Sequence, residues 1–486
     1  MLAAALALLA PPALPNIVYI LADDIGYGDL SSYGAKKVQT PNIDRIGREG
    51  IRFTDAHSPA AVCTPTRYSL MTGEYAWRSK RGGEGILSGV APLCIDLAKN
   101  KTLPQMLKQA GYTTGISGKW HLGLGETKSD YNGLISPGPK EVGFDYSFII
   151  PATGDRVPCV YVENGRVVNY DPNDPIQVQY GKKIGDDPTG KENPELLKLK
   201  TVPGQGHLDT IVNGISRIGF MSGGKKARWV DEDMADTITG KAVDFIKKNA
   251  SKPFFLYFPT HDIHAPQRPN ARFEGKSNLG LRGDTITELD WSVGQVLKTL
   301  DDLKLSKNTI VIFTSDNGGT PNDGYADPRE NNEGHNVNGA LRGEKYTDYE
   351  GGHRVPFVIR WPGKIPSGRV STALISQMDM YSSFASLVSV PVGPRDAVDS
   401  FDLSDVLLGR KLNGGRDTLA YLRGGKVPLG LRKGDWSLVP KPAGAELFNL
   451  RTDPGQKKNV AAENPEVVRA MQEEVARIQA GVRTRP

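Results

Sequence analysis

Four short apolar runs, each followed at once by polar residues, constrain the fold of this chain more than any other feature. The runs cover residues 17–22, 112–117, 254–258 and 309–314. Runs of this length that are apolar on both faces are typical of strands buried inside a mostly parallel sheet. The sequence therefore predicts a sheet whose central strands are covered on both sides.

Three segments between these runs carry apolar residues at helical spacing. In the first, Thr102 is in the N-cap position and Pro104 lies in the first turn. The second spaces Met234, Ile238 and Phe245 along one face, and the third extends this pattern from Ile286 to Leu300. Alternating strands and helices predict an α/β fold with a large doubly wound sheet flanked by helices. Because ligands in such folds bind beyond the carboxyl ends of the strands, the polar residues after the four runs should face one crevice.

The chain has 486 residues, which suits more than one domain. We expect a catalytic α/β domain over residues 16–400. Within it, residues 153–228 are rich in Pro, Gly and charge, which predicts an excursion over the active-site face, with a plain surface insertion as the competing interpretation. Residues 401–486 predict a smaller C-terminal α+β domain of antiparallel strands and a terminal helix capped by Asn464 and ended by Gly481.

The amino-terminal residues 1–15 are apolar and small, with prolines at their end, although no Lys or Arg precedes them. This composition predicts a signal peptide and an exported protein, periplasmic or secreted. Prolines and the Asp23-Asp24 pair interrupt the apolar run, and no later segment is long and apolar enough to cross a membrane. The net charge of +5 is spread along the chain, which argues against nucleic acid as a partner.

Two of the three cysteines, Cys94 and Cys159, leave two alternatives open: one disulfide or two reduced thiols. The third, Cys63, stands in AAVCTPTRYSLMTG, where Pro65 favours the start of a helix and Gly73 favours its end. Arg67 lies one helical turn after Cys63. Taken alone, this stretch indicates a buried cysteine at a helix start.

Oxygen-bearing side chains follow the first and the last of the four runs. Asp23 and Asp24 come after the first run, and Asp316 and Asn317 come after the last. Each alone suits a helix cap or a turn, but together they form a set of hard oxygen ligands for Ca²⁺ or Mg²⁺. No cysteine or histidine spacing is typical of zinc.

Cationic and imidazole side chains follow the other runs. Lys119 and His121 come after the second run and His264 after the third, while Lys345 lies in a polar, glycine-containing stretch. Grouped at strand ends, the lysines would hold a tetrahedral oxyanion and the histidines would move protons. The residues alone thus predict a metal-assisted hydrolase of sulfate or phosphate esters.

The motifs that contain these residues also carry a resemblance to a known family. C-T-P-T-R, G-K-W-H-L-G, H-A-P, S-D-N-G-G, the E-G-G and R-V-P after Lys345, and the late E-L-F-N-L-R-T-D-P-G resemble the motifs of type I, formylglycine-dependent sulfatases, in the same order. The resemblance spans nearly the whole mature chain. It implies an alkaline-phosphatase-like fold and similarity to arylsulfatases and N-acetylgalactosamine-6-sulfatases.

The resemblance also implies a cofactor and a modified residue. Cys63 would be oxidised to formylglycine (3-oxoalanine) by a formylglycine-generating enzyme. The modified residue 63 would bind Ca²⁺ together with Asp23, Asp24, Asp316 and Asn317. One hydroxyl of its hydrated aldehyde would attack sulfur and displace the sugar alcohol.

Roles for the remaining residues follow from the same resemblance. Lys119 and Lys345 would bind the sulfate oxygens. His264 would bind the sulfate ester and protonate the leaving oxygen, His121 would take the proton that releases sulfate, and Arg67 would orient residue 63. His261 and His353 match no required family position and are interpreted as structural.

The expected substrate is a sulfated sugar of the galactose or N-acetylgalactosamine type, again from the resemblance. Within the excursion, Arg156, His207 and Arg217 are basic residues that would grip the sugar or its acidic groups, with a structural role for each as the alternative. Two other functions are considered. One is a formylglycine-dependent phosphodiesterase or phosphonate monoester hydrolase, and the other is an inactive protein that binds sulfated glycans.

Overall fold

The computed structural model describes residues 14–79, 81, 83, 85–321, 323–329, 332, 334–424 and 428–486. The predicted signal peptide lies outside these residues except for its last two positions. None of the helices in the described ranges combines the length and the apolar character needed to cross a membrane.

A ten-stranded sheet forms the centre of the molecule, with the strand order β15-β2-β14-β13-β1-β12-β4-β5-β6-β7. The five strands β13-β1-β12-β4-β5 run parallel to one another, whereas β14 and β6 pair antiparallel on either side. The predicted runs correspond to the four adjacent strands β13, β1, β12 and β4, and the mostly parallel sheet is confirmed. The strands are β1 (Asn16–Ala22), β2 (Ile51–Phe53), β4 (Thr113–Lys119), β5 (Tyr146–Ile150), β6 (Val162–Glu163), β7 (Arg166–Val167), β12 (Phe254–Pro259), β13 (Thr309–Ser315), β14 (Phe357–Arg360) and β15 (Arg369–Ser371).

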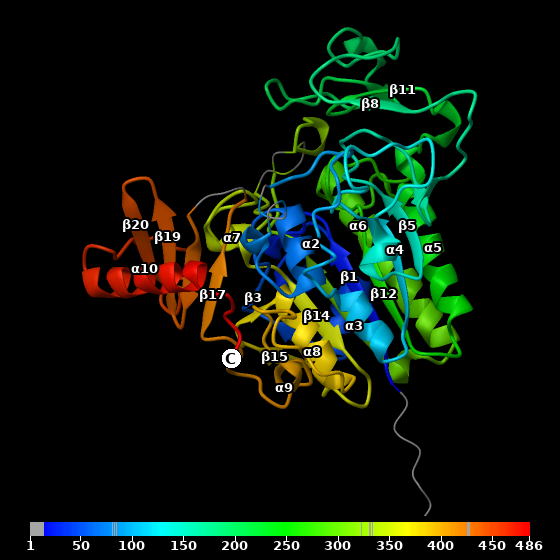
Figure 1. The fold of residues 1–486 in the computed structure, drawn as a ribbon. Helices are drawn as coiled ribbons and strands as arrows, with labels where there is room; N and C mark the ends of the chain where they lie inside the picture. Colours follow the sequence, from blue (N-terminus) through cyan, green and yellow to red (C-terminus); the bar gives the residue numbers. More distant parts are fainter. Residues whose placement is uncertain are drawn as a thin grey trace, which may run out of the picture.

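Helices cover both faces of this sheet, as expected for a doubly wound fold (Figure 1). One group, α1, α5 and α6, packs on one face, and α2, α3 and α8 pack on the other. Thr102 caps α3 as predicted, because its side chain accepts a hydrogen bond from the backbone N–H of Gln105. The helices are α1 (Pro41–Arg48), α2 (Cys63–Thr72), α3 (Leu103–Gln109), α4 (Pro139–Val142), α5 (Met234–Lys248), α6 (Gly280–Asp302), α7 (Glu350–His353) and α8 (Met380–Leu387).

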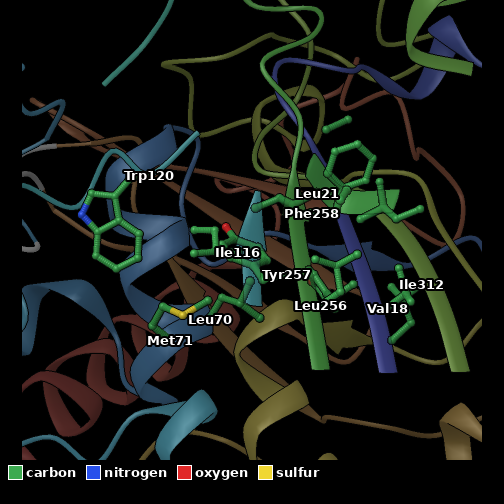
Figure 2. Close-up of a cluster of buried hydrophobic side chains, with 14 of the residues drawn as sticks. Val18, Leu21, Leu70, Met71, Ile116, Trp120, Leu256, Tyr257, Phe258 and Ile312 are labelled. Carbon is green, nitrogen blue, oxygen red and sulfur yellow. The ribbon is translucent and has the colours of Figure 1, made fainter. Parts of the chain in front are cut away.

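Helix α2 is buried along its whole length. Its residues Leu70 and Met71 lie beside Ile116 and Tyr257 of the sheet (Figure 2). The helix ends at Gly73, whose φ of 66° is left-handed and favours glycine, as the sequence predicted. Full burial means that the cationic Arg67 must find partners inside the protein.

The predicted excursion contains two small antiparallel pairs that no sequence pattern indicated. Strand β8 (Gln177–Gln179) pairs with β11 (Phe220–Ser222), and β9 (Ile211–Val212) pairs with β10 (Ile215–Ser216). In Figure 1, β8 and β11 lie beyond the carboxyl ends of the central strands. The short strands β6 and β7 in this stretch instead extend the edge of the main sheet.

A four-stranded antiparallel sheet and a terminal helix follow near the carboxyl end. The strands are β17 (Thr418–Tyr421), β18 (Gly430–Lys433), β19 (Trp436–Lys441) and β20 (Gly444–Asn449), and α10 (Pro465–Ala480) packs against β18. Asn464 precedes α10, but its side chain donates to the Val460 carbonyl instead of capping the helix. Helix α9 (Ser404–Leu407) packs on α8, so contact with the large sheet unit continues past residue 400.

Two smaller features complete the fold. Strands β3 (Ala56–His57) and β16 (Ile375–Ser376) form a parallel pair outside the main sheet. Cys94 and Cys159 are both buried, and neither forms a disulfide. Of the two alternatives considered for these cysteines, the structure has the reduced one.

Candidate active site

Strand register brings the predicted oxygen ligands together at the carboxyl edge of the sheet. Because Leu21 of β1 lies opposite Thr314 of β13, both strands end at the same level. The Asp24 N–H donates to Asp316 Oδ1 (3.4 Å), and Asn317 Nδ2 donates to Asp24 Oδ1 (2.7 Å). Asp24 has a left-handed φ of 61°, which turns the chain sharply after β1.

This cluster fits a calcium ion. Ligand atoms of Asp23, Asp24, Asp316 and Cys63 all lie within 4.8 Å of one another. Asn317 Oδ1 is buried and has no hydrogen-bond partner among the described residues. Burial and the charge of Asp316 raise the pKa of Asp23 well above its usual value, despite the nearby Lys119. A set of hard oxygen atoms in which one carboxylate is not fully compensated by its cationic neighbours is suited to Ca²⁺.

Cys63 is the first residue of α2 and is fully buried beside the carboxylates. Its Sγ lies 3.8 Å from Asp23 Oδ1. Burial raises the pKa of the thiol to about 12, although Lys119 and Lys345 oppose this rise. At neutral pH the group is therefore an uncharged thiol, which is a poor nucleophile.

Three buried cations hold the three carboxylates in place. Lys119 Nζ contacts Asp23 Oδ2 at 2.5 Å, and Lys345 Nζ contacts Asp24 Oδ2 at 2.7 Å. Arg67 binds Asp316 Oδ2 through Nε (3.1 Å) and Nη2 (2.8 Å). Its Nη1 also donates to the Lys119 carbonyl (3.0 Å), so Arg67 links the ends of β4 and β13.

Both predicted proton-transfer histidines lie in this crevice. His264 Nδ1 donates to the Ala265 carbonyl (2.9 Å), which leaves Nε2 facing Asp24 Oδ2 at 3.8 Å. Burial, together with Lys345, lowers the pKa of His264 to about 3. His121 Nε2 donates to the Leu87 carbonyl (2.9 Å), and its buried Nδ1 has no hydrogen-bond partner in the described part of the chain.

The excursion reaches the site through Asp155, a residue that the sequence analysis missed. Asp155 accepts hydrogen bonds from Arg156 Nη1 (2.8 Å) and His207 Nε2 (3.0 Å), and its Oδ1 lies 4.0 Å from His264 Nδ1. A single carboxylate in a loop gives no periodic signal, so only the fold reveals this role. Arg217 is instead buried in an ion pair with Asp231 (2.6 Å).

The two histidines left out of the predicted site have other partners. His261 Nε2 lies 3.2 Å from Asp262 Oδ1. His353 Nδ1 lies 2.9 Å from His57 Nδ1, and its ring stacks on Tyr421 of the antiparallel sheet.

Taken together, the contacts described above bring ten predicted residues to the carboxyl edge of the central strands: Asp23, Asp24, Cys63, Arg67, Lys119, His121, His264, Asp316, Asn317 and Lys345.

This arrangement defines the class of the protein. The model of the family described as Sulfatase matches residues 15–390, and the chain belongs to the sulfatase family. It is 50% identical over 477 residues to an N-acetylgalactosamine-6-O-sulfatase of Bacteroides thetaiotaomicron, covering 94% of this chain and 92% of that protein. It is 33% identical over 432 residues to an N-acetylgalactosamine-6-sulfatase of Canis lupus familiaris, covering 84% and 69% respectively.

A solved structure confirms the fold. This structure, described under the metabolism of multiple glycosaminoglycans by Bacteroides thetaiotaomicron, superimposes with a TM-score of 0.93 and 48% identity. The superposition covers 96% of this chain and 100% of that one. The resemblance found in the sequence is thereby confirmed, and the chain is a sulfatase-family enzyme.

Proposed function

We propose that this enzyme removes sulfate from a sulfated carbohydrate, with residue 63 acting as the nucleophile after conversion to formylglycine. The observation that carries the proposal is the position of Cys63. It begins α2, is fully buried, and is surrounded by Asp23, Lys119 and Lys345. Its uncharged thiol would be inert there, whereas a hydrated aldehyde on the same side chain supplies a hydroxyl nucleophile.

Asp23, Asp24, Asp316 and Asn317 would hold Ca²⁺ together with the modified residue 63. The unpartnered Asn317 Oδ1 and the raised pKa of Asp23 support this assignment. Bound Ca²⁺ supplies positive charge that polarises sulfate oxygens and activates the hydroxyl of residue 63. Arg67, bound to Asp316 and to the Lys119 carbonyl, orients residue 63 by fixing the strand ends around it.

The sulfate group would bind between Lys119 and Lys345. Both ammonium groups are fully buried on their aspartate partners. Burial alone would lower the pKa of Lys345, but Asp24 and Cys63 raise it, so this lysine stays charged. Fixed positive charges in a water-excluded site stabilise the charge that develops on sulfate oxygens during transfer.

The histidines would move the protons. His264 in its doubly protonated form would donate its Nε2 proton to the leaving sugar oxygen, because its Nδ1–H stays bonded to the Ala265 carbonyl. A bound sulfate ester would offset the charge of Lys345 and so raise the proton affinity of His264. His121 Nδ1 has no partner among the described groups and would accept the proton from residue 63 that releases sulfate.

For the substrate we propose a 6-sulfated N-acetylgalactosamine or galactose unit, because the two curated relatives are named for that activity. Arg156 and His207 would contact the sugar, since both are bound to Asp155, which lies next to His264. We further propose export through the apolar residues 1–15, and oxidation of Cys63 by a formylglycine-generating enzyme in the host.

One combined experiment tests the proposal. The protein is produced in a host that has a formylglycine-generating enzyme, the peptide containing residue 63 is weighed by mass spectrometry, and turnover of an aryl sulfate and an aryl phosphodiester is measured. We expect the aldehyde mass and a preference for the sulfate. An unmodified thiol in fully active enzyme would refute the mechanism, and a preference for phosphorus would indicate the phosphodiesterase. If the protein binds a sulfated glycan but does not hydrolyse it, and Cys63→Ala does not alter this binding, the protein is an inactive binder.

A further inference from the structure

One aromatic side chain is exposed at the edge of this otherwise buried site. Tyr346 is 50% exposed, whereas Lys345, the residue before it, is 1% exposed. Within the described part of the chain, Tyr346 is the only aromatic residue among the strongly exposed large apolar side chains. Its ring centroid lies 5.4 Å from Lys345 Nζ. The ring therefore adjoins the ammonium group proposed to bind sulfate.

The backbone of Tyr346 is held in a conformation that a bulky residue rarely adopts. Its φ is 71°, in the left-handed region. Its N–H donates to the Ala61 carbonyl (3.0 Å), shortly before Cys63, and the flanking Glu344 N–H donates to Thr347 Oγ1 (3.0 Å). Strained residues of this kind cluster at functional sites. A glycine would adopt the same backbone without strain, so replacing Tyr346 with glycine removes the ring without disturbing the backbone.

The phenol of Tyr346 faces the charged groups of the site. Lys345 lowers the pKa of Tyr346, but burial and the neighbouring Cys63, Asp24 and Asp323 together raise it to about 12. The phenol is therefore uncharged at neutral pH. It also interacts electrostatically with Arg156, on the excursion side of the site. Its hydroxyl has no hydrogen-bond partner among the described residues.

We propose that Tyr346 is a stacking platform for the sugar ring that carries the sulfate. The lysines and histidines that would bind the sulfate ester offer no surface for the apolar C–H face of a pyranose. Aromatic rings supply such a surface at ligand sites, with few rotatable bonds to immobilise. With the sulfate at Lys345, the adjacent ring lies where the attached sugar must pass, and the free hydroxyl can bond a sugar hydroxyl. This inference rests on the proposed carbohydrate sulfatase function.

The test uses the modified holoenzyme and the variants Tyr346→Gly and Tyr346→Phe. With N-acetylgalactosamine 6-sulfate as substrate, Tyr346→Gly should raise KM about tenfold and leave kcat unchanged, because an interface tyrosine commonly carries binding energy of that size. Tyr346→Phe keeps the ring and loses only the hydroxyl, so it should raise KM much less than Tyr346→Gly does. The inhibition constant of inorganic sulfate should not change, because Lys119 and Lys345 remain.

A matched control separates stacking from backbone effects. Lys304 also has a left-handed φ, of 58°, and is exposed at the end of α6, away from the site. Both Lys304→Gly and Tyr346→Gly should keep or raise the melting temperature, because each relieves strain, but only Tyr346→Gly should change KM. If Tyr346→Gly leaves KM unchanged, the stacking role is refuted. If the substitution raises KM and the inhibition constant of sulfate by the same factor, Tyr346 only positions Lys345. Wild-type enzyme that cleaves no sulfated sugar would instead refute the proposed function.

Discussion

Two buried clusters of ionisable side chains lie in different parts of this molecule. One is the active-site cluster, formed by Asp23, Asp24, Asp316 and Cys63 with their cations. The other, which we call the histidine cluster, contains Asp55, His57, Glu350 and His353 and lies where the large sheet unit meets the antiparallel sheet. Each cluster brings together residue types that bind metals.

The clusters differ in how far their negative charge is compensated. Burial would raise the pKa of Asp55, but Arg354, a hydrogen bond from His57, and Arg432 outweigh it and hold that pKa far below its usual value. At Asp23 the balance is reversed, because burial and Asp316 outweigh Lys119. Of these two carboxylates, only Asp23 carries a negative charge that its cationic neighbours do not fully compensate. Charge balance, more than the presence of ligand residues, therefore distinguishes a cation site from a structural network.

Replacing the proposed nucleophile, residue 63, should have the largest effect on kcat and should distinguish the two clusters most clearly. Cys63→Ala should lower kcat of the mature enzyme about 10⁴-fold or more, since removing a nucleophile abolishes the covalent route. His353→Gln, which alters the histidine cluster, should leave kcat of the folded enzyme near the wild-type value. Steady-state turnover of an aryl sulfate checks both. More than about 1% of wild-type activity in Cys63→Ala, with the substitution confirmed by mass spectrometry, would contradict the role of residue 63 as nucleophile. A loss of only about 10²-fold is too small for removal of a nucleophile.

Removing one carboxylate should lower mainly the free energy of unfolding in the histidine cluster and mainly the activity in the active-site cluster. Arg432 and Arg354 lie 3.1 and 3.7 Å from the Asp55 carboxylate, and Asp55→Asn removes this shared partner. The substitution should lower the free energy of unfolding by about 3 kcal/mol and leave kcat unchanged. Asp23→Asn should abolish most activity but leave the metal-free protein no less stable than metal-free wild type. Denaturant unfolding and turnover, measured on the same samples, provide the test. A stability loss in Asp23→Asn equal to that in Asp55→Asn would contradict the assignment.

Metal removal should act on one cluster only. Calcium added to chelated wild type at 100 times its dissociation constant should raise the free energy of unfolding by about 2.7 kcal/mol. Asp55→Asn should show the same increase, whereas Asp23→Asn should show little. Thermal unfolding across a calcium titration measures this. Activity that survives thorough chelation would argue against the calcium site.

Acidic pH should affect the histidine cluster through the free energy of unfolding. Burial and the neighbouring His57 hold the pKa of His353 well below its usual value, so the unfolded chain takes up a proton near pH 6.5 that the folded protein refuses. Stability from this residue is complete above pH 6.5 and is lost as the pH falls below it. Between pH 7.5 and 5.5, wild type should lose about 1.4 kcal/mol more than His353→Gln. Equal losses would show that His353 is not the group responsible.

Much of the fold and the site followed from local sequence patterns. The central strands were predictable because strands buried on both faces are continuously apolar, and the site residues that follow these strands could be predicted from them. The roles of Cys63 and Arg67 came from the family resemblance, because their stretch alone indicates only a buried cysteine at a helix start. Asp155, Tyr346 and the histidine cluster were not, because their roles depend on contacts between distant segments. Asp55 and Arg432, for example, are separated by 377 positions in the chain. No periodicity links such residues, and only the folded structure brings them together.

The complete burial of α2 also limits when the proposed conversion of Cys63 could take place. A second protein that oxidises this side chain would have to reach it, and every residue of the helix is covered once the chain has folded. On the proposed function, residue 63 would therefore be converted in the nascent or unfolded polypeptide. A cell that folds the chain too quickly would accumulate a stable but permanently silent product.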